Sequence, residues 1–146
     1  MSLGNLCPAE SPSPIDLRRS QRWCRRLARS HYENFLVATF LLPRQMRQPF
    51  YNIYAFCRTA DDVADESPSP DQALKGLELL QRQIDDLFTG NPAETTFLPA
   101  LADTVREFRL PKKPFDDLIS AFRQDQRVLQ YDSMDQLLDY CSRSAN

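Results

Sequence analysis

The residue types best suited to chemistry gather in one short segment, YAFCRTADDVAD, which spans residues 54–65. Asp61 and Asp65 are four residues apart, so on a helix both carboxylates project from the same side. Arg58 lies three residues before Asp61 and Tyr54 lies seven before it, which extends the same polar stripe. Carboxylates beside an arginine are the groups that a divalent cation and a phosphate would use.

This acidic stripe is unfavourable for the helix that carries it. Aspartate is a poor helix former, and negative charge near a helix C-terminus opposes the helix dipole by roughly 0.3–1 kcal/mol per charge. Asp61 and Asp65 also repel each other at four-residue spacing. A bound Mg²⁺ would relieve all three effects, because it accepts one or two carboxylates and fills its octahedron with water and phosphate oxygens. From the residues alone, two interpretations stay open: a metal–diphosphate site, or a solvated acidic face.

The same segment carries a resemblance to a known family. The pattern Tyr-x-Phe-Cys-Arg-x-x-Asp-Asp-x-x-Asp resembles the first aspartate-rich motif of squalene and phytoene synthases. The upstream strings HYENF (31–35) and LLP (41–43) are similar as well, and the pairs at 125–126 and 140–141 fall where that family has similar pairs. The resemblance covers roughly residues 16–146. HYENF is most similar to the hydroxysqualene synthase branch of the bacterial hopanoid pathway.

The resemblance implies roles for residues in and before the acidic segment. Asp61 and Asp65 would be catalytic, holding the Mg²⁺ that binds a prenyl diphosphate. Arg58 would pair with phosphate oxygens, for which its planar guanidinium group is well suited. Three residues are implied to lie near the diphosphate: His31, Tyr32 and Asn34. His31 is the only histidine of the chain, and its other interpretation is a structural residue with satisfied hydrogen bonds.

Three further residues have an implied role and a structural alternative. Phe35 would face the isoprenoid chain or a carbocation, whose charge an aromatic face stabilises, or it is an ordinary core residue. Tyr140 would be catalytic by hydrogen-bonding near the departing diphosphate, or it only packs between helices. Asp125 would be a substrate-binding polar residue of the cavity, or it lies at the surface.

The implied activity is that of a complete Mg²⁺-dependent squalene or hydroxysqualene synthase, acting on farnesyl or presqualene diphosphate in triterpene (hopanoid) biosynthesis. The family has a second aspartate-rich motif in its C-terminal half. This sequence offers none, because Asp132, Asp135 and Asp139 lack the apolar and arginine context and are expected on the exposed side of one helix. We therefore expect a truncated N-terminal half that is inactive without its C-terminal half. The alternatives are a phytoene or dehydrosqualene synthase, and a non-catalytic helical interaction module.

The elements that position these residues are expected to be helices only. The chain has 146 residues, enough for one domain, and its three glycines are too few for the turns of a sheet. Apolar residues recurring every three or four positions predict helices at residues 15–30, 44–65, 71–88, 96–108, 113–130 and from 133 onward. Residues 31–42 are expected to form a short buried helix or an extended turn. Residues 15–146 would then be the N-terminal part of an isoprenoid-synthase helical bundle, after a flexible lead-in of residues 1–14.

The predicted helix over residues 44–65 should bury one apolar face. The residues that recur at the required spacing are Phe50, Ile53, Cys57, Ala60 and Ala64. The polar stripe that carries Asp61 and Asp65 is displaced by one residue along the chain from Ala60 and Ala64 of this face, and so lies beside it around the helix. The sequence therefore predicts a helix that is packed on one side and exposes its carboxylates on the other.

The first predicted helix is strongly basic. Six of the fifteen arginines fall between residues 18 and 29, and Arg18, Arg22, Arg25 and Arg29 line one face. This face is either simply solvated or a peripheral contact with a membrane, into which prenyl substrates partition. Nucleic acid is not an expected partner, because no aromatic interleaving or recognition motif accompanies the charge and the net charge of the chain is −2.

Cysteine usage and hydropathy favour a cytoplasmic protein, with membrane association left open. Cys7, Cys24, Cys57 and Cys141 are spaced too widely for a Cys-x-x-Cys motif. Cys24 and Cys57 stand among apolar residues and are expected to be buried free thiols, which suits a reducing compartment. The longest apolar run, residues 35–42, is too short to span a bilayer, and the N-terminus does not resemble a signal peptide.

Overall fold

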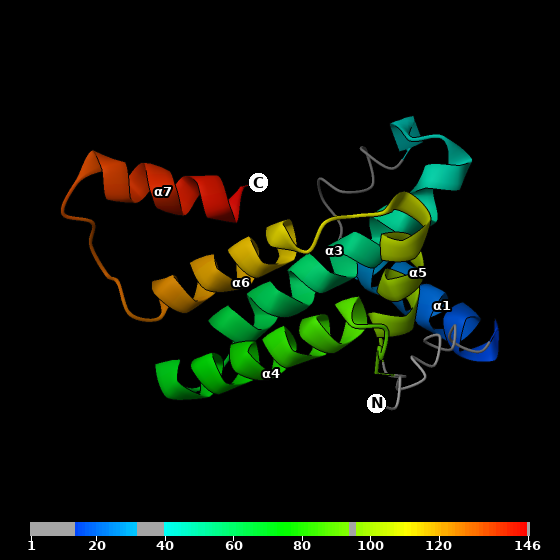
Figure 1. Ribbon diagram of the computed structural model, residues 1–146, viewed down its shortest axis with the longest axis horizontal. Helices are drawn as coiled ribbons and strands as arrows, with labels where there is room; N and C mark the ends of the chain where they lie inside the picture. The colour runs from blue at the N-terminus through cyan, green and yellow to red at the C-terminus, as the bar shows by residue number, and fades with distance from the viewer. Residues whose placement is uncertain (1–13, 32–39, 94–95, 146) are drawn as a thin grey trace, which may run out of the picture.

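The computed structural model describes residues 14–31, 40–93 and 96–145, and within these ranges the chain forms helices and no strand (Figure 1). The helices, in chain order, are α1 (Pro14–Ser30), α3 (Arg44–Asp65), α4 (Pro70–Phe88), α5 (Leu98–Phe108), α6 (Lys113–Asp125) and α7 (Met134–Ser144). The all-α prediction is confirmed. Residues 1–13 and most of residues 31–42 lie outside the described residues, so the expected lead-in and the expected short helix are not tested.

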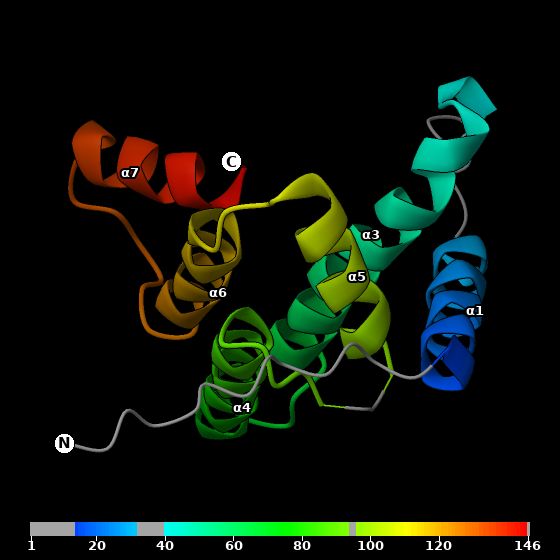
Figure 2. The same ribbon diagram turned by 45° about the vertical axis from the view of Figure 1, so that its right-hand side comes forward.

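Helix α3 runs through the middle of the bundle and packs against α1, α4, α5 and α6 (Figures 1 and 2). Its buried face was predicted only in part. Ala60 and Ala64 are buried as expected and Ile53 and Cys57 are partly buried, but the Phe50 side chain is 40% exposed. Four residues outside the predicted stripe are buried as well, because four helices surround α3: Tyr51, Asn52, Ala55 and Phe56.

Serine side chains cap the starts of α4 and α7. The Ser133 hydroxyl accepts a hydrogen bond from the Gln136 backbone N–H at 3.3 Å at the start of α7. The Ser69 hydroxyl accepts from the Gln72 N–H at the same distance at the start of α4, where Pro70 takes the first helical position. Each bond satisfies a backbone donor that the helix itself leaves unpaired.

Helix α6 ends at Asp125, five residues before the predicted end. Beyond it the side-chain amide of Gln126 donates to the Ala64 carbonyl at 3.1 Å, which ties the end of α6 to the end of α3. The chain then leaves the bundle, and the Leu129 side chain is 99% exposed. The apolar residues after Asp125 continued the sequence pattern, but Leu129 is in solvent, so a further turn would bury little apolar surface.

Aromatic rings fill the centre of the bundle. The ring centroids of Phe56 on α3 and Phe115 on α6 are 5.0 Å apart, and those of Phe115 and Phe88 on α4 are 5.6 Å apart. Phe97, just before α5, lies 6.5 Å from Phe56. Tilted rings at such separations contribute beyond their buried area, so this cluster joins α3, α4, α5 and α6.

Helix α7 lies apart from this core. Its extensive contact is with α6, none of its residues is buried, and Figure 1 shows it at the opposite end of the molecule from α1. Asp132, Asp135 and Asp139 are exposed, as predicted. No helix in the described ranges is long and apolar enough to cross a membrane.

Candidate functional site

The predicted acidic segment occupies the C-terminal turns of α3. The last turn contains no basic residue, and the chain continues into another acid, Glu66, whose N–H bonds the Asp62 carbonyl at 2.9 Å. Carboxylates therefore gather where the helix dipole is already negative. The arrangement that the sequence implied to be unfavourable, aspartates at the C-terminal end of a helix, is present in the structure.

Arg58 organises the acidic end of α3. Its guanidinium nitrogens lie 2.7 Å from the Asp62 carboxylate, 3.3 Å from that of Asp61 and 4.0 Å from that of Glu66. The contact with Asp61 was expected from the spacing. Asp62 was not singled out, although its four-residue separation from Arg58 was a usable signal. A single cation faces three carboxylates, so this end of α3 stays net negative.

One buried donor of Arg58 has no partner among the described residues. The Arg58 Nε is inaccessible to solvent and makes no hydrogen bond there, and Asp62 Oδ1 approaches the guanidinium at an ion-pair distance without hydrogen-bond geometry. The Arg58 side chain as a whole is 28% exposed, so a phosphate oxygen would pair with the accessible part of its guanidinium group.

Asp61 and Asp65 reach solvent, one turn apart. The Asp61 side chain is 40% exposed and Asp65 is exposed. Within residues 14–31, 40–93 and 96–145, no group of three or more His, Cys, Asp or Glu is arranged to hold a metal ion. Two carboxylates at this spacing are nevertheless the number that Mg²⁺ takes when water and phosphate oxygens supply its other ligands.

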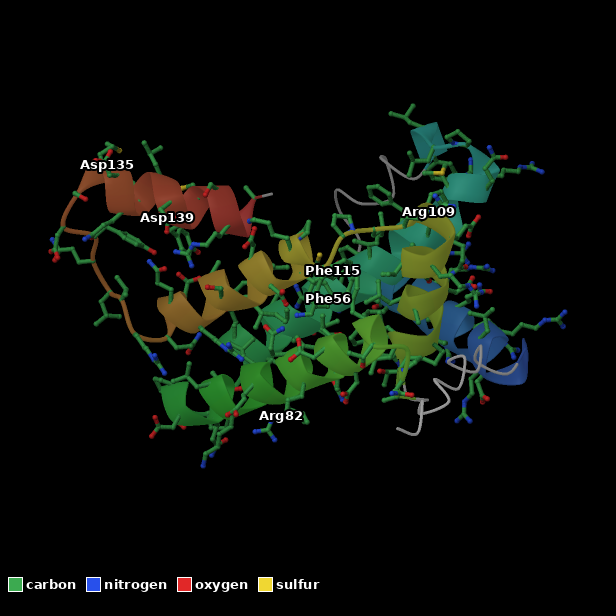
Figure 3. The ribbon with its side chains drawn as sticks, viewed as in Figure 1. Phe56, Arg82, Arg109, Phe115, Asp135 and Asp139 are labelled. Carbon is green, nitrogen blue, oxygen red and sulfur yellow. The ribbon has the colours of Figure 1, made fainter. Side chains whose placement is uncertain are left out.

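An open pocket of about 390 Å³ begins beside this charged group, between α3 and α6. Its apolar lining consists of Ile53, Phe56, Cys57, Pro114, Phe115, Leu118 and Phe122. Tyr54, Arg58 and Asp61 supply the polar part of the wall, and Ser144 of α7 also lines it. Figure 3 shows Phe56 and Phe115 in the space between the two helices. The arrangement suits a ligand with a long apolar body and an anionic head.

The environment of the pocket wall disfavours ionisation of its neutral groups. Burial raises the pKa of the Cys57 thiol to about 11, and the Asp61 carboxylate adds to the shift. Burial also raises the pKa of Tyr54. The positive charge of Arg58 opposes this shift, and the negative charges of Asp62 and Asp61 reinforce it. Both groups are therefore uncharged near neutral pH and add no charge to the pocket wall.

Tyr140 and Asp125, predicted separately, contact each other. The Tyr140 hydroxyl donates to the Asp125 carboxylate at 2.7 Å, and this bond is the main reason that the pKa of Tyr140 is raised to about 12. Neither residue lines the pocket beside Arg58. The pair joins α6 to α7, together with Arg143, which donates to Ser120 at 3.0 Å.

The upstream candidates are not brought to the site within the described residues. His31 is exposed, directly after α1, and does not line the pocket. Tyr32, Asn34 and Phe35 lie outside the described residues, so their predicted positions stay predictions. The residues that sequence reasoning missed are Phe115, Leu118 and Phe122 of α6, whose spacing of three and four along one face was the available signal.

Comparison with known proteins agrees with this fold and with the acidic helix. The fold is that of helical isoprenoid synthases, as its structural neighbours show. A model described as squalene/phytoene synthase matches residues 28–146. The chain belongs to the squalene/phytoene synthase family.

Two solved structures are similar to most of the chain. A squalene synthase HpnC from Alicyclobacillus acidocaldarius is 41% identical with a TM-score of 0.80, over 91% of this chain and 49% of that one. A dehydrosqualene synthase in complex with ligand is 28% identical with a TM-score of 0.79, over 89% of this chain and 44% of that one.

Curated relatives carry the name phytoene synthase. The protein from Arthrospira platensis is 32% identical over 91% of this chain and 43% of its own length. The protein from Rhodobacter capsulatus is 34% identical over 84% of this chain and 36% of its own length. The chain thus spans less than half the length of these relatives.

Proposed function

We propose that this chain is the prenyl-diphosphate-binding portion of a Mg²⁺-dependent squalene or hydroxysqualene synthase. The observation that carries the proposal is the apolar pocket whose wall includes Arg58 and Asp61. A prenyl diphosphate has the same two parts, an apolar chain and a strongly anionic head. An apolar pocket next to an arginine and carboxylates would bind both parts together, the head with the help of a cation.

In this proposal each part of the wall has its own task. The guanidinium group of Arg58, whose side chain is 28% exposed and lines the pocket, donates to a phosphate oxygen. Asp61 and Asp65 hold Mg²⁺, which when bound would neutralise the diphosphate as it departs. Phe56, Phe115 and the other apolar residues of the pocket surround the isoprenoid chain and exclude water from it.

The proposed reaction belongs to a longer protein. Its substrates would be farnesyl or presqualene diphosphate, and its product a triterpene of the hopanoid route. The relatives are more than twice as long as this chain. We expect the remaining half to supply a second acidic motif that faces the first across the cavity, because a departing diphosphate has to be neutralised from more than one side.

The choice within the family rests on sequence identity. The chain is 41% identical to the squalene synthase HpnC and 28% identical to the dehydrosqualene synthase, which favours the squalene branch. The alternative is a phytoene synthase, which the curated relatives support at 32% and 34% identity. Product analysis after incubating the full-length protein in parallel with farnesyl, presqualene and geranylgeranyl diphosphate separates the two, because a C30 product requires C15 units and C40 phytoene requires C20 units.

The acidic pair is tested by substitution in the full-length protein. Asp61→Asn or Asp65→Asn should lower turnover by at least about a hundredfold, because the transition-state charge loses its cation, while the helical circular dichroism stays unchanged. Asp86→Asn, on the exposed side of α4, makes the same change of charge and should leave turnover within about twofold. Near-normal activity of the Asp61 variant with unchanged Mg²⁺ dependence would reject the site.

The 146-residue chain alone should not convert farnesyl or presqualene diphosphate to a triterpene. Half of the bundle leaves the cavity open to water and supplies one acidic motif only. The measurement is incubation with labelled substrate and Mg²⁺, followed by extraction into organic solvent. Formation of squalene or hydroxysqualene that Asp61→Asn abolishes would show that the second half is not needed. A non-catalytic module would instead bind no diphosphate, either as the 146-residue chain or as the full-length protein.

A further inference from the structure

Positive charge is concentrated on one helix of the molecule. α1 carries six arginines and a single acid, Asp16, whereas the whole chain has a formal net charge of −2. The rest of the chain is therefore clearly acidic. The six arginines are all exposed: Arg18, Arg19, Arg22, Arg25, Arg26 and Arg29. A negatively charged surface would repel most of this molecule and attract α1.

Large apolar side chains are exposed at the same end. Phe40 is 75% exposed and Leu41 is 83% exposed, just before α3, and the exposed Arg44 follows them. Both views place α1 and the start of α3 together, at the opposite end from α7 (Figures 1 and 2). Two neighbouring apolar side chains that are this exposed form a surface to which an apolar partner can bind.

Side-chain contacts join the arginines and the apolar pair into one surface. Arg25 of α1 donates to the Gln48 side chain of α3 at 2.7 Å, and Gln48 donates back to the Gln21 carbonyl at 3.0 Å. Arg47, the neighbour of Gln48, donates to the carbonyl of Leu42 at 3.1 Å. The backbone next to the exposed pair is thus bonded to α3, and the following residue of α3 is bonded to α1.

We propose that this basic end, made of the six arginines of α1 with Phe40 and Leu41, binds the surface of an anionic lipid bilayer. Guanidinium groups pair with headgroup phosphates, and the negative potential of the bilayer attracts the basic end before contact. Phe40 and Leu41 then enter the boundary between headgroups and acyl chains, where exposed apolar side chains gain most. A purely solvated basic face predicts no contribution of Phe40 and Leu41 to bilayer binding, so the apolar pair distinguishes the two interpretations.

The inference stands on charge and exposure and does not require the proposed chemistry. If both proposals hold, bilayer binding would bring the pocket close to its substrates and products, because these apolar molecules partition into the bilayer that α1 contacts. The two proposals fail separately, because bilayer binding is measured without substrate or Mg²⁺.

The test is flotation of the 146-residue chain with vesicles, in which aggregated protein sediments and bound protein rises. The chain should float with phosphatidylcholine vesicles that contain phosphatidylglycerol and not with phosphatidylcholine alone. Salt of about 0.5 M should release it, because the Debye length falls to a few ångströms. Flotation with both kinds of vesicle, or with neither, would overturn the proposal.

Matched variants locate the surface. Arg18→Gln/Arg22→Gln/Arg29→Gln should lower the partition coefficient about a hundredfold, since each Lys or Arg near an anionic surface contributes about a factor of five. The control carries the same loss of charge on exposed positions of α4 and α6: Lys75→Gln, Arg82→Gln and Lys113→Gln. Its partition coefficient should stay within about tenfold of the unsubstituted chain. Equal losses in both triple variants would show a general charge effect and overturn the assignment to α1.

The apolar part is tested by Leu41→Ser, which keeps every charge. It should weaken vesicle binding severalfold at low salt, and Leu79→Ser, at a 58% exposed position of α4, should not. If Leu41→Ser binds vesicles as well as the unsubstituted chain does, the apolar pair is not part of the membrane-binding surface. If the chain binds RNA as tightly as it binds the vesicles, the proposal of a lipid surface as the partner of the basic end is overturned in favour of nucleic acid.

Discussion

Helices α3 and α7 are both amphipathic in sequence, yet the structure treats them in opposite ways. α3 is covered by four helices and buries six of its residues, whereas α7 packs on α6 and buries none. Met134 and Leu138 of α7 are 67% and 58% exposed. An apolar stripe predicts that a helix forms and which side seeks cover, but a neighbouring element has to supply that cover.

The two helices are also held by different forces. α3 is fixed by buried apolar area and by Asn52, whose side-chain amide donates to the Ala100 carbonyl at 3.1 Å and to the Thr104 hydroxyl at 3.0 Å. α7 is fixed by partly exposed polar contacts such as that between Tyr140 and Asp125. Such hydrogen bonds contribute about 1 kcal/mol each, so α7 should open locally while the core stays folded.

The largest expected difference between the two regions is in the cost of removing an apolar side chain. Phe56→Ala leaves a cavity in the aromatic cluster and should lower the free energy of unfolding by about 3–5 kcal/mol. Leu138→Ala on α7 should change it by less than about 0.5 kcal/mol, because the side chain is already in water. Urea unfolding followed by circular dichroism measures both. Similar losses would mean that α7 is part of the cooperative core.

Thiol reactivity should separate the regions by a somewhat smaller factor. In a Cys7→Ser background, Cys141 on α7 is exposed, whereas Cys24 is fully buried and Cys57 partly so. Burial raises the pKa of Cys24 to about 12 and that of Cys57 to about 11, which leaves little thiolate near pH 8. Cys141 should react with an aromatic disulfide reagent at least about a hundredfold faster than the other two. Cys141→Ser should remove the fast phase, and a fast phase that persists would contradict the burial of Cys24 and Cys57.

The smallest expected effect concerns the bond between Tyr140 and Asp125. Tyr140→Phe should lower the local stability of α7 by about 1 kcal/mol, seen as faster amide hydrogen exchange in α7 and not in α3. The hydroxyl donates only when protonated and its pKa is raised to about 12. Its contribution is therefore complete below about pH 10, the pKa in an unfolded chain, and is lost as the pH rises towards 12.

Spectrophotometric titration measures that window directly. The difference between the unsubstituted chain and Tyr140→Phe isolates the ionisation of Tyr140, whose midpoint should lie well above 10. Asp125→Asn removes the carboxylate that raises this pKa most and should bring the midpoint down. A midpoint near 10 in the unsubstituted chain would mean that α7 is not held on α6 in solution.

The sequence predicted those parts of the site that lie on one helix. Arg58 and Asp61 are three residues apart, so helical geometry alone brings them together, and the observed 3.3 Å contact follows. The Asp62 contact was equally local and was overlooked. The contact between Asp125 and Tyr140 could not be predicted, because a connector separates the two residues and its path depends on how α7 meets α6.

The sequence by itself determined that the chain is helical, where most helices begin, and which face of α3 carries its charge, because capping bonds and helical spacing act within a few residues. Tertiary structure alone decided that Phe50 is exposed, that α6 ends at Asp125 and that α7 buries nothing. It also decided that α3 and α6 enclose an apolar pocket beside Arg58. Burial depends on which surfaces meet, and that is a property of pairs of helices that no single stretch of sequence contains.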